Sequence, residues 1–324
     1  MGIHISTKTG REKVLRHVVH NRKGIVSKTE LKQETTKVAP RTDVVTEKER
    51  RYFEYLIENE PLLQDTVGLL IDGDAYPCEY SGNQEPPLEN SAHIHWGRVV
   101  RNISESVNFS KTSPDVVEAS IVTTIEGAMK ISAPYHLSRR KRHAVLFKPF
   151  QETCTRKVLF HRISRSTDPS QAWKVAMISG GQGGTTLTEM TIDALWLNLE
   201  GESIEAHSAF QHSFILNGNK HATPLLKANQ QVDIAMTVRS KEMEQNMIAI
   251  RSMACEDTPA RVQLQLQGDS RQDVEYCQTY SGKMRTGALP GIQSIVVEAI
   301  SRSSLYETGS PISSNFWIFP VVIL

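Results

Sequence analysis

The chain has 324 residues, of which 39% are hydrophobic and 23% are charged, and its mean hydropathy is -0.34. This composition supports one large or two medium folded domains and excludes a chain that is disordered throughout. No apolar run reaches the roughly 17–25 residues that a membrane helix needs, and the low aromatic content with many Ser, Thr, Gln and Asn residues argues against an all-helical fold.

The formal net charge of +1 conceals four blocks of alternating sign. Residues 1–51 carry +7, residues 52–138 carry -9, residues 139–165 carry +8 and residues 166–324 carry -5. Two basic blocks therefore interrupt an acidic chain, and each can attract a phosphate backbone, an anionic membrane surface or an acidic partner. The alternative is that each block is only a solvated surface.

The N-terminal part of the chain predicts a basic, flexible arm over residues 1–45, because it contains few large apolar side chains. Thr46 and Glu49 then have the spacing of a capping box, which predicts a short amphipathic helix that ends before Pro61. Its apolar positions are Phe53, Leu56 and Ile57. We expect residues 46–90 to form a small helical and strand region that ends in a surface loop.

Residues 91–324 predict a β-rich core, because short runs of β-branched or alternating apolar residues follow one another. The strands expected in the chain are Val14–Val19, Val67–Ile71, Val116–Ile125 continued by Met129–Ile131, Ala144–Phe147, Lys157–Ile163, Trp173–Ile178, Thr188–Leu199, Phe210–Leu216, Val232–Val238, Val262–Leu266, Ile295–Ile300 and Phe316–Leu324. Gly180–Gly184 predicts a flexible hairpin loop, and Lys241–Ile250 predicts a short helix. We therefore expect a mainly β chain with a few helices, arranged as an antiparallel sandwich or a jelly-roll-like core.

The strongest candidate site is a basic and aromatic stretch within residues 139–165. The residues that we expect to bind nucleic acid are Arg139, Arg140, Lys141, Arg142, Lys148, Arg156, Lys157, Phe147 and Phe150. Cations can contact phosphates while aromatic rings stack on unpaired bases, which is what a groove for single-stranded RNA requires. The run Arg139–Arg142 also fits a signal for a nuclear import receptor. The alternative is a sheet with the phenylalanines on its inner face and the basic residues outside.

Other motifs indicate turns or structural residues. Asp72 and Asp74 follow an apolar run and would suit Mg²⁺ in a metal-dependent hydrolase, but no regular alternation of strands and helices carries the other motifs of such enzymes. His93 and His95 have the spacing of two metal ligands on one strand, yet no acidic residue follows at the expected distance. The glycine run lacks the lysine of a phosphate-binding loop. We therefore expect no enzyme activity, no cofactor and no metal site.

The cysteines indicate a reducing environment. Cys78, Cys154, Cys255 and Cys277 are too widely spaced for a zinc ribbon, and we expect reduced structural thiols. Residues 1–13 contain no apolar stretch of the kind found in signal peptides. We expect an intracellular protein, in the cytoplasm, the nucleus or the cell periphery.

The basic arm, the β-rich core and the basic and aromatic stretch together resemble the movement proteins of plant RNA viruses that have a jelly-roll-like core, including those of plant rhabdoviruses. Proteins of that group usually carry an aspartate shortly after an apolar core strand, and Asp193 is the nearest candidate. The resemblance implies a non-enzymatic protein that binds single-stranded RNA or nucleoprotein and escorts it between cells. The runner-up is a viral matrix or capsid protein, which would associate with itself and contact an anionic membrane surface.

Overall fold

The computed structural model describes part of the chain. The described residues are 44–63, 79–80, 95–133, 144–186, 188–199, 202–211, 213–215, 223–255, 258–272 and 274–324. The chain divides into a first unit, Met1–Thr42, which lies outside the described residues, and a second unit, Asp43–Leu324. Residues 1–43 of the predicted arm, the strands expected at Val14–Val19 and Val67–Ile71, and the acidic pair Asp72 and Asp74 also lie outside them.

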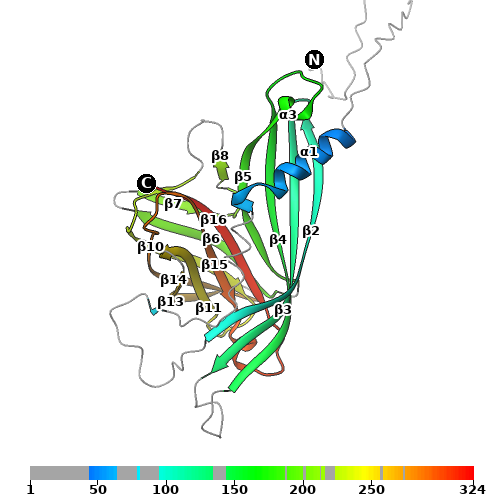
Figure 1. Ribbon diagram of the computed structural model, residues 1–324. Helices are drawn as coiled ribbons and strands as arrows, with labels where there is room; N and C mark the ends of the chain where they lie inside the picture. Colours follow the sequence, from blue (N-terminus) through cyan, green and yellow to red (C-terminus); the bar gives the residue numbers. More distant parts are fainter. Residues whose placement is uncertain are drawn as a thin grey trace, which may run out of the picture. The chain divides into compact units, whose positions relative to one another are not determined.

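The second unit consists of two β-sheets and a few short helices (Figure 1). The larger sheet contains, in spatial order, β1 (Glu79–Tyr80), β12 (Thr258–Gln263), β11 (Met247–Cys255), β15 (Gly291–Ile300), β16 (Ser314–Ile323), β5 (Trp173–Thr185), β4 (Ala144–Arg162), β3 (Val116–Ala133) and β2 (His95–Ser113). β8 (Ser213–Ile215) pairs with β5, and β9 (Leu225–Leu226) pairs with β16. The smaller sheet contains β13 (Gln265–Gln272), β14 (Glu275–Arg285), β10 (Gln231–Ser240), β6 (Met190–Leu199) and β7 (Glu202–Ala206). The main pairings are antiparallel, so the predicted mainly β sandwich is confirmed.

Helix α1 (Glu47–Glu58) begins where the sequence predicts it. The backbone N–H of Glu49 donates to the Thr46 hydroxyl at 3.3 Å, and the backbone N–H of Thr46 donates to the Glu49 carboxylate at 2.9 Å, which completes the capping box. Phe53 is fully buried, and its ring stacks on that of Phe160 with 4.4 Å between centroids. These contacts attach α1 to one face of β2–β5, which we call the inner face. The two shorter helices are α3 (Pro169–Ala172) and α4 (Arg302–Tyr306).

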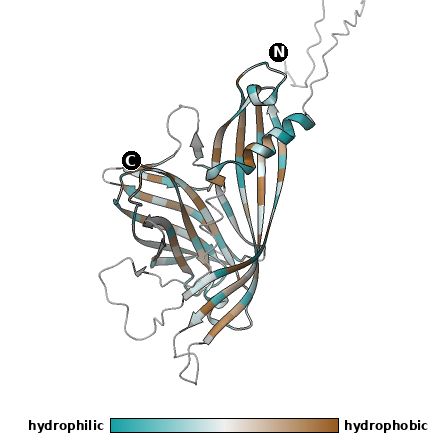
Figure 2. Cartoon of the chain, in the orientation of Figure 1, coloured by the Kyte–Doolittle hydropathy of each residue, from teal (hydrophilic) through white to brown (hydrophobic). Residues whose placement is uncertain are grey.

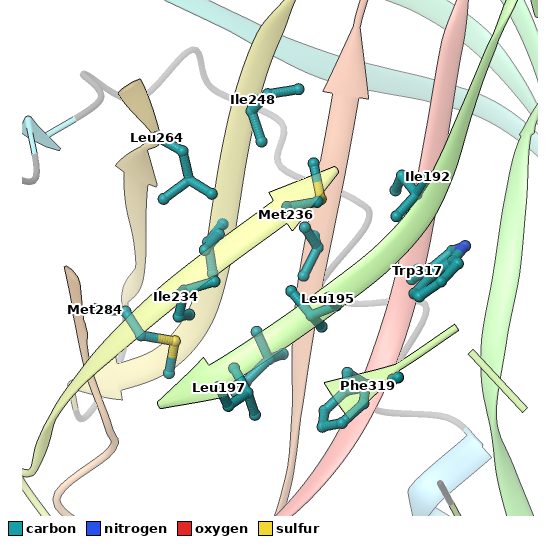
Figure 3. Packing of buried hydrophobic residues seen from close by; sticks show 14 of the residues in the cluster. Ile192, Leu195, Leu197, Ile234, Met236, Ile248, Leu264, Met284, Trp317 and Phe319 are labelled. Carbon is teal, nitrogen blue, oxygen red and sulfur yellow. The ribbon is translucent and has the colours of Figure 1, made fainter. Parts of the chain in front are cut away.

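Strands β11, β15 and β16 form a layer that is buried on both sides. Along β16, Trp317 and Phe319 join the cluster shared with the smaller sheet, whereas Phe316 and Ile318 join a second cluster shared with β3 and β4. Figure 3 shows the first cluster, with side chains from β6 and β10 facing Trp317 and Phe319. Because both faces are covered, the strand reads as a continuous apolar run rather than an alternating one, which explains why the last ten residues are the most apolar stretch.

Most of the strands expected from the sequence are present. Those confirmed are Val116–Ile125 with its continuation, Trp173–Ile178, Thr188–Leu199, Val232–Val238, Ile295–Ile300 and Phe316–Leu324. Ala144–Phe147 and Lys157–Ile163 belong to one long strand, β4, and Val262–Leu266 is divided between β12 and β13. No helix in the described part of the chain is long and apolar enough to span a bilayer.

The prediction of a hairpin loop at Gly180–Gly184 is wrong, because these glycines lie inside β5. A Cβ atom on Gly180 would lie 2.2 Å from the carbonyl oxygen of Ala209 and 2.5 Å from that of Ile318. The glycines are needed for close backbone approach on both sides of the strand. The helix predicted at Lys241–Ile250 is also wrong, because its second half begins β11, where Ile248 and Ile250 pack on one face.

Replacement of Gly180 should therefore destabilise the fold. We expect Gly180→Ala to lower the free energy of unfolding by about 1–3 kcal/mol or more, because the methyl group meets backbone atoms that cannot rotate away. Gly268→Ala is the matched control in another strand, where a Cβ atom meets nothing within 4 Å, and it should change stability by less than about 0.5 kcal/mol. Urea unfolding measures both values, and equal stability of the two variants would contradict this account.

Candidate nucleic-acid interface

Most of the described part of the basic and aromatic stretch lies in β4, between β3 and β5. Successive side chains of a strand point to opposite faces. The even-numbered residues from Lys148 to Phe160 are buried, while the odd-numbered residues over the same span are exposed or half-buried. Figure 2 shows that hydrophilic and hydrophobic residues are interspersed along the long strands. The predicted site residues in β4 therefore form two groups, a buried group with even numbers and an outward group with odd numbers.

Lys148 belongs to the buried group and is only 4% exposed. Its ammonium donates to the carbonyl oxygens of Ser304 at 2.6 Å, Ser310 at 3.0 Å and Glu307. Burial lowers the pKa of Lys148, and the nearby Glu307 carboxylate opposes that shift. The side chain attaches β4 to α4 and the turn after it, so its charge is used inside the fold.

Arg156 is also buried, with 5% of its surface exposed. Its guanidinium donates to the carbonyl oxygen of Leu62 at 3.0 Å and to that of Ser179 at 3.1 Å. Burial lowers the pKa of Arg156 to about 10, against the opposing influence of Cys154 and Glu60. This arginine joins the segment that follows α1 to β4 and β5.

Phe150 completes the buried group at 6% exposure. It packs in the cluster that includes Trp96, Met129 and Phe316, and the Arg98 guanidinium lies 6.0 Å from the centre of its ring. The side chains of all three residues are at most 6% exposed, so they offer little surface to a base or a phosphate in the folded protein. Lys148, Phe150 and Arg156 are therefore structural in this fold, and we correct the predicted interface by removing them.

Phe147 and Lys157 belong to the outward group. Phe147 is 56% exposed, and its cross-strand neighbour on β3 is Lys130. Val145, two residues earlier on the same face, is 47% exposed. Lys157 is half-buried and donates to Glu118 at 3.1 Å. The outer face at the start of β4 thus presents the exposed ring of Phe147, the adjoining Val145 and the cross-strand Lys130, whereas Lys157 lies toward the other end of the strand.

The run Arg139–Arg142 lies outside the described residues, in the segment that connects β3 to β4. The last paired residues before and after that segment are Ala133 and Ala144. Phe147 is therefore three residues along β4 from the point where this segment rejoins the sheet. Because the chain is continuous, the basic run belongs to the same end of the β3–β4 hairpin as the exposed ring of Phe147.

A shallow open hollow of about 450 Å³ continues the outer face beyond Phe147. Its lining residues are Arg101, Glu126, Gly127, Pro149, Phe150 and Gln151. The Gln151 amide donates to the Glu126 carboxylate at 2.6 Å, which fixes the polar part of the lining. Arg101 occupies a bulge in β2 and is exposed, so it adds a cation on the far side of the hollow from the hairpin end.

Four charged residues that the sequence patterns did not reveal are fully buried, and we call them the charged quartet: Arg98, Glu152, Glu298 and Arg251. Arg98 forms a bidentate pair with Glu152 at 2.7 and 2.8 Å and also donates to Glu298. Arg251 donates to Glu298 at 2.6 Å, and the Ser314 hydroxyl donates to Glu152 at 2.6 Å. Burial alone would lower the pKa of Arg98, but the two carboxylates raise it overall.

The quartet joins the layer of β2 and β4 to the layer of β11 and β15. A signal for it exists in the sequence, because Glu298 interrupts the apolar run Ile295–Ile300 and Glu152 has the same parity as the buried residues of β4. A carboxylate in such a position needs a buried cation as its partner. Sequence alone does not indicate which arginine supplies that cation.

The remaining candidate residues do not form a site in the described part of the chain. Asp193 lies on the outward face of β6 and accepts a bidentate pair from Arg239 at 2.9 and 2.8 Å, so its described role is to join neighbouring strands. His95 begins β2, and His93 lies outside the described residues. Within the residues described, no three His, Cys, Asp or Glu side chains are close enough to hold a metal ion.

No family model matches the chain, and neither the curated proteins nor the solved structures include a match. The resemblance to plant-virus movement proteins therefore rests on the sequence profile.

The quartet makes a strong prediction about stability. Glu298→Gln leaves two buried guanidinium groups with one carboxylate, and we expect it to reduce the free energy of unfolding by about 3–5 kcal/mol. Asp233→Asn is the control, since this exposed carboxylate lies 3.7 Å from Lys283 and its loss should cost at most about 1 kcal/mol. Chemical denaturation compares them. A Glu298 variant as stable as the control would show that the quartet contributes little.

Cysteine reactivity gives a second prediction. Burial raises the pKa of the Cys154 thiol to about 12, whereas Cys277 is half-exposed. Because the thiolate is the nucleophile, iodoacetamide at pH 8 should alkylate Cys277 in the folded protein and leave Cys154 unmodified until the protein unfolds. Mass spectrometry of tryptic peptides measures both sites. Equal rates of modification in the native protein would contradict the placement of Cys154.

Proposed function

We propose that the protein is a non-enzymatic binder of single-stranded RNA or nucleoprotein, of the viral movement type, that escorts an RNA cargo. The observation that carries the proposal is the exposed ring of Phe147, which lies next to a connecting segment with the four consecutive basic residues Arg139–Arg142. An aromatic ring that the fold leaves in water, beside a dense positive charge, has the two components needed to hold a single strand.

The two components contribute differently to binding. Stacking on Phe147 depends on a base being unpaired and tolerates any sequence, because every base has a π-face. Contacts from Arg139–Arg142 neutralise phosphates and release counterions, which makes affinity fall with salt. Lys130, opposite Phe147, and Arg101, beyond the hollow, extend the positive charge along the outer face. The expected ligand is therefore single-stranded and bound with little sequence preference.

The structure also affects how much charge the second basic block can offer. Lys148 and Arg156 are committed to carbonyl oxygens inside the fold, and Lys157 is paired with Glu118. Of the cations predicted for the interface, Arg139–Arg142 are therefore the ones that the proposal assigns to the ligand. The other basic segment is the N-terminal arm, for which the sequence gives a net charge of +7 over residues 1–51.

The ring of Phe147 can be tested against its buried counterpart. Phe147→Ala should weaken binding to fluorescein-labelled single-stranded RNA by about 1–3 kcal/mol and leave the thermal unfolding midpoint nearly unchanged. Phe150→Ala is the matched variant on the opposite face, and it should lower folding stability by about 3–5 kcal/mol. Fluorescence anisotropy and thermal melts measure the two effects. Unchanged RNA affinity of Phe147→Ala would count against the proposed interface.

The basic run can be tested by the salt dependence of binding. Replacing Arg139, Arg140, Lys141 and Arg142 with alanine should lower the slope of log affinity against log salt by roughly 0.7 for each phosphate that is no longer neutralised. A control with the same change in net charge replaces four exposed basic residues elsewhere in the chain, which are Lys227, Lys241, Lys283 and Arg285. That control should retain the wild-type slope.

Three outcomes distinguish the proposed function from its rivals. If both quadruple variants change the slope equally, binding follows net charge and the interface is not at the hairpin end. If the Arg139–Arg142 variant binds RNA normally but fails to enter nuclei, the run is an import signal. If it binds RNA normally but no longer binds vesicles containing phosphatidylserine, a matrix-type membrane contact is favoured instead.

A further inference from the structure

We infer that the free edge of β2 pairs with the same edge of a second copy of this chain, which joins two larger sheets through an antiparallel β2–β2 contact. This inference concerns a surface other than the hairpin end and does not depend on RNA binding. β2 is the last strand of the larger sheet, and among the described residues it pairs only with β3 (Figure 1). A long strand with one unpaired edge presents a row of backbone donors and acceptors to any strand that fits.

The central part of β2 lacks two features that usually protect an edge, a proline and a mid-strand bulge, although its inner face carries Glu105 and Lys111. Its two bulges lie at Val100–Asn102 and Lys111–Ser113, and pairing with β3 is regular between them. Residues 102–106 are all exposed, and Ile103 has 43% of its surface in water. Prolines, inward-pointing charges and mid-strand bulges normally prevent edge-to-edge contact. Between the two bulges β2 has neither a proline nor a bulge, and Glu105 is its only charged residue before Lys111.

Strand geometry restricts how two copies can pair. A two-fold axis perpendicular to the sheet makes the strands antiparallel and keeps the inner faces of both copies on the same side. Residues that face each other must then have the same parity, because side chains alternate between faces. Only registers centred on a single residue satisfy this condition, so each candidate register can be examined by the side chains that it brings together.

The register centred on Asn108 brings complementary side chains together from Ser104 to Thr112. On the inner face, Glu105 meets Lys111 of the second copy and Val107 meets Phe109, each twice by symmetry. On the outer face the pairs are Asn108 with Asn108, Ser106 with Ser110, and Ser104 with Thr112. Opposite charges meet, apolar residues meet, and small polar residues meet.

The neighbouring registers lack this agreement. Centred on Ser106, the pairing places Arg101 opposite Lys111, and centred on Glu105 it places two carboxylates opposite each other. Centred on Val107, it places Glu105 against Phe109. Opposite charges across a strand pair contribute roughly 0.2–1 kcal/mol and like charges are unfavourable. Among these neighbouring registers, the side chains of the edge therefore favour the one centred on Asn108.

The surroundings of Glu105 support the same pairing. Burial raises the pKa of this carboxyl group, and the nearby Glu58 carboxylate raises it further. Lys111 from a second copy would supply a positive charge to this position. Lys111 also lies near Glu49 on α1, which leaves it between two carboxylates in the paired state.

Helix α1 lies beside the proposed contact. It lies on the inner face, where the Arg50 guanidinium is 5.7 Å from the centre of the Phe109 ring and Glu49 is near Lys111. Glu58, at the end of the helix, is near Glu105, so α1 extends to both sides of Asn108 along the strand. The two-fold axis places α1 of the second copy at the same level on the inner face, so the paired state requires the two helices to lie side by side across the contact.

Cysteine cross-linking tests the register directly. Asn108→Cys places the two new thiols opposite each other at the two-fold axis, with Cα atoms about 4.5–5.5 Å apart, which suits a disulfide. Ser106→Cys is the matched control on the same strand and face, because its symmetry mate is opposite residue 110 and too distant to react. Under mild oxidation of the full chain, we expect a covalent dimer of Asn108→Cys and at most the wild-type background for Ser106→Cys. A mixture of Ser106→Cys and Ser110→Cys should form a mixed dimer.

Charge reversal tests the inner-face pairs independently. Glu105→Lys and Lys111→Glu should each raise the dissociation constant of the dimer about tenfold or more, and the double variant should restore it because the pairs are re-formed with opposite sign. Sedimentation velocity measures all four proteins, and thermal melts establish that each is folded. A wild-type protein that is monomeric at every concentration overturns the proposal, as does equal cross-linking of Asn108→Cys and Ser106→Cys. Loss of RNA binding in a variant that still dimerises would concern only the hairpin end.

Discussion

Four charged side chains without access to water connect the two parts of the larger sheet. Arg98 and Glu152 come from strands near one edge, whereas Arg251 and Glu298 come from the layer that also packs on the smaller sheet. Desolvating four charges is costly, and their mutual attraction offsets that cost only when the geometry is satisfied. The quartet therefore favours one arrangement of the two layers over others in which the same apolar surfaces could slide. We attribute the relative position of the two layers to the charged quartet and most of the stability to the apolar clusters.

The second constraint is the alternation of side chains along β4, which places the residues of one basic stretch on opposite faces of the sheet. Lys148 and Arg156 face inward and bind carbonyl oxygens, so they hold α4 and the segment after α1 against the sheet. Phe147 faces outward and is not covered by any described element. A shift of one residue in the pairing of β4 would expose the buried cations and bury the exposed ring. The register that builds the core thus also determines what the outer face can bind.

Local patterns in the sequence were sufficient to predict much of the fold. The capping box at Thr46 and Glu49 and the alternation in Val232–Val238 depend on neighbouring residues, and both features are present. The prediction of a loop at the glycine run was wrong because the glycines accommodate the backbone of Ala209 and Ile318. Both residues are distant in sequence, so local patterns do not indicate these contacts. Likewise, Lys148 and Arg156 are residue types that usually lie on a protein surface. Their hydrogen-bond partners, Ser304 and Leu62, are 156 and 94 residues away in the sequence, and only these long-range contacts explain their burial. Sequence indicated the basic stretch as important without showing which half of it is accessible.

The two surfaces that remain open lie on the same three strands and face different ways. Binding at the hairpin end uses side chains on the outer face, whereas pairing at β2 uses its backbone edge and leaves that outer face uncovered. A strand that joined the free edge would extend the sheet in its own plane, so the outer faces of both copies would remain on one side. Two copies of Phe147 would then face the same side, and in the proposed function a single RNA strand would contact both. Linked contacts of this kind raise affinity through effective concentration without any new interaction, so the proposed pairing at β2 would strengthen the proposed binding of a long, charged strand.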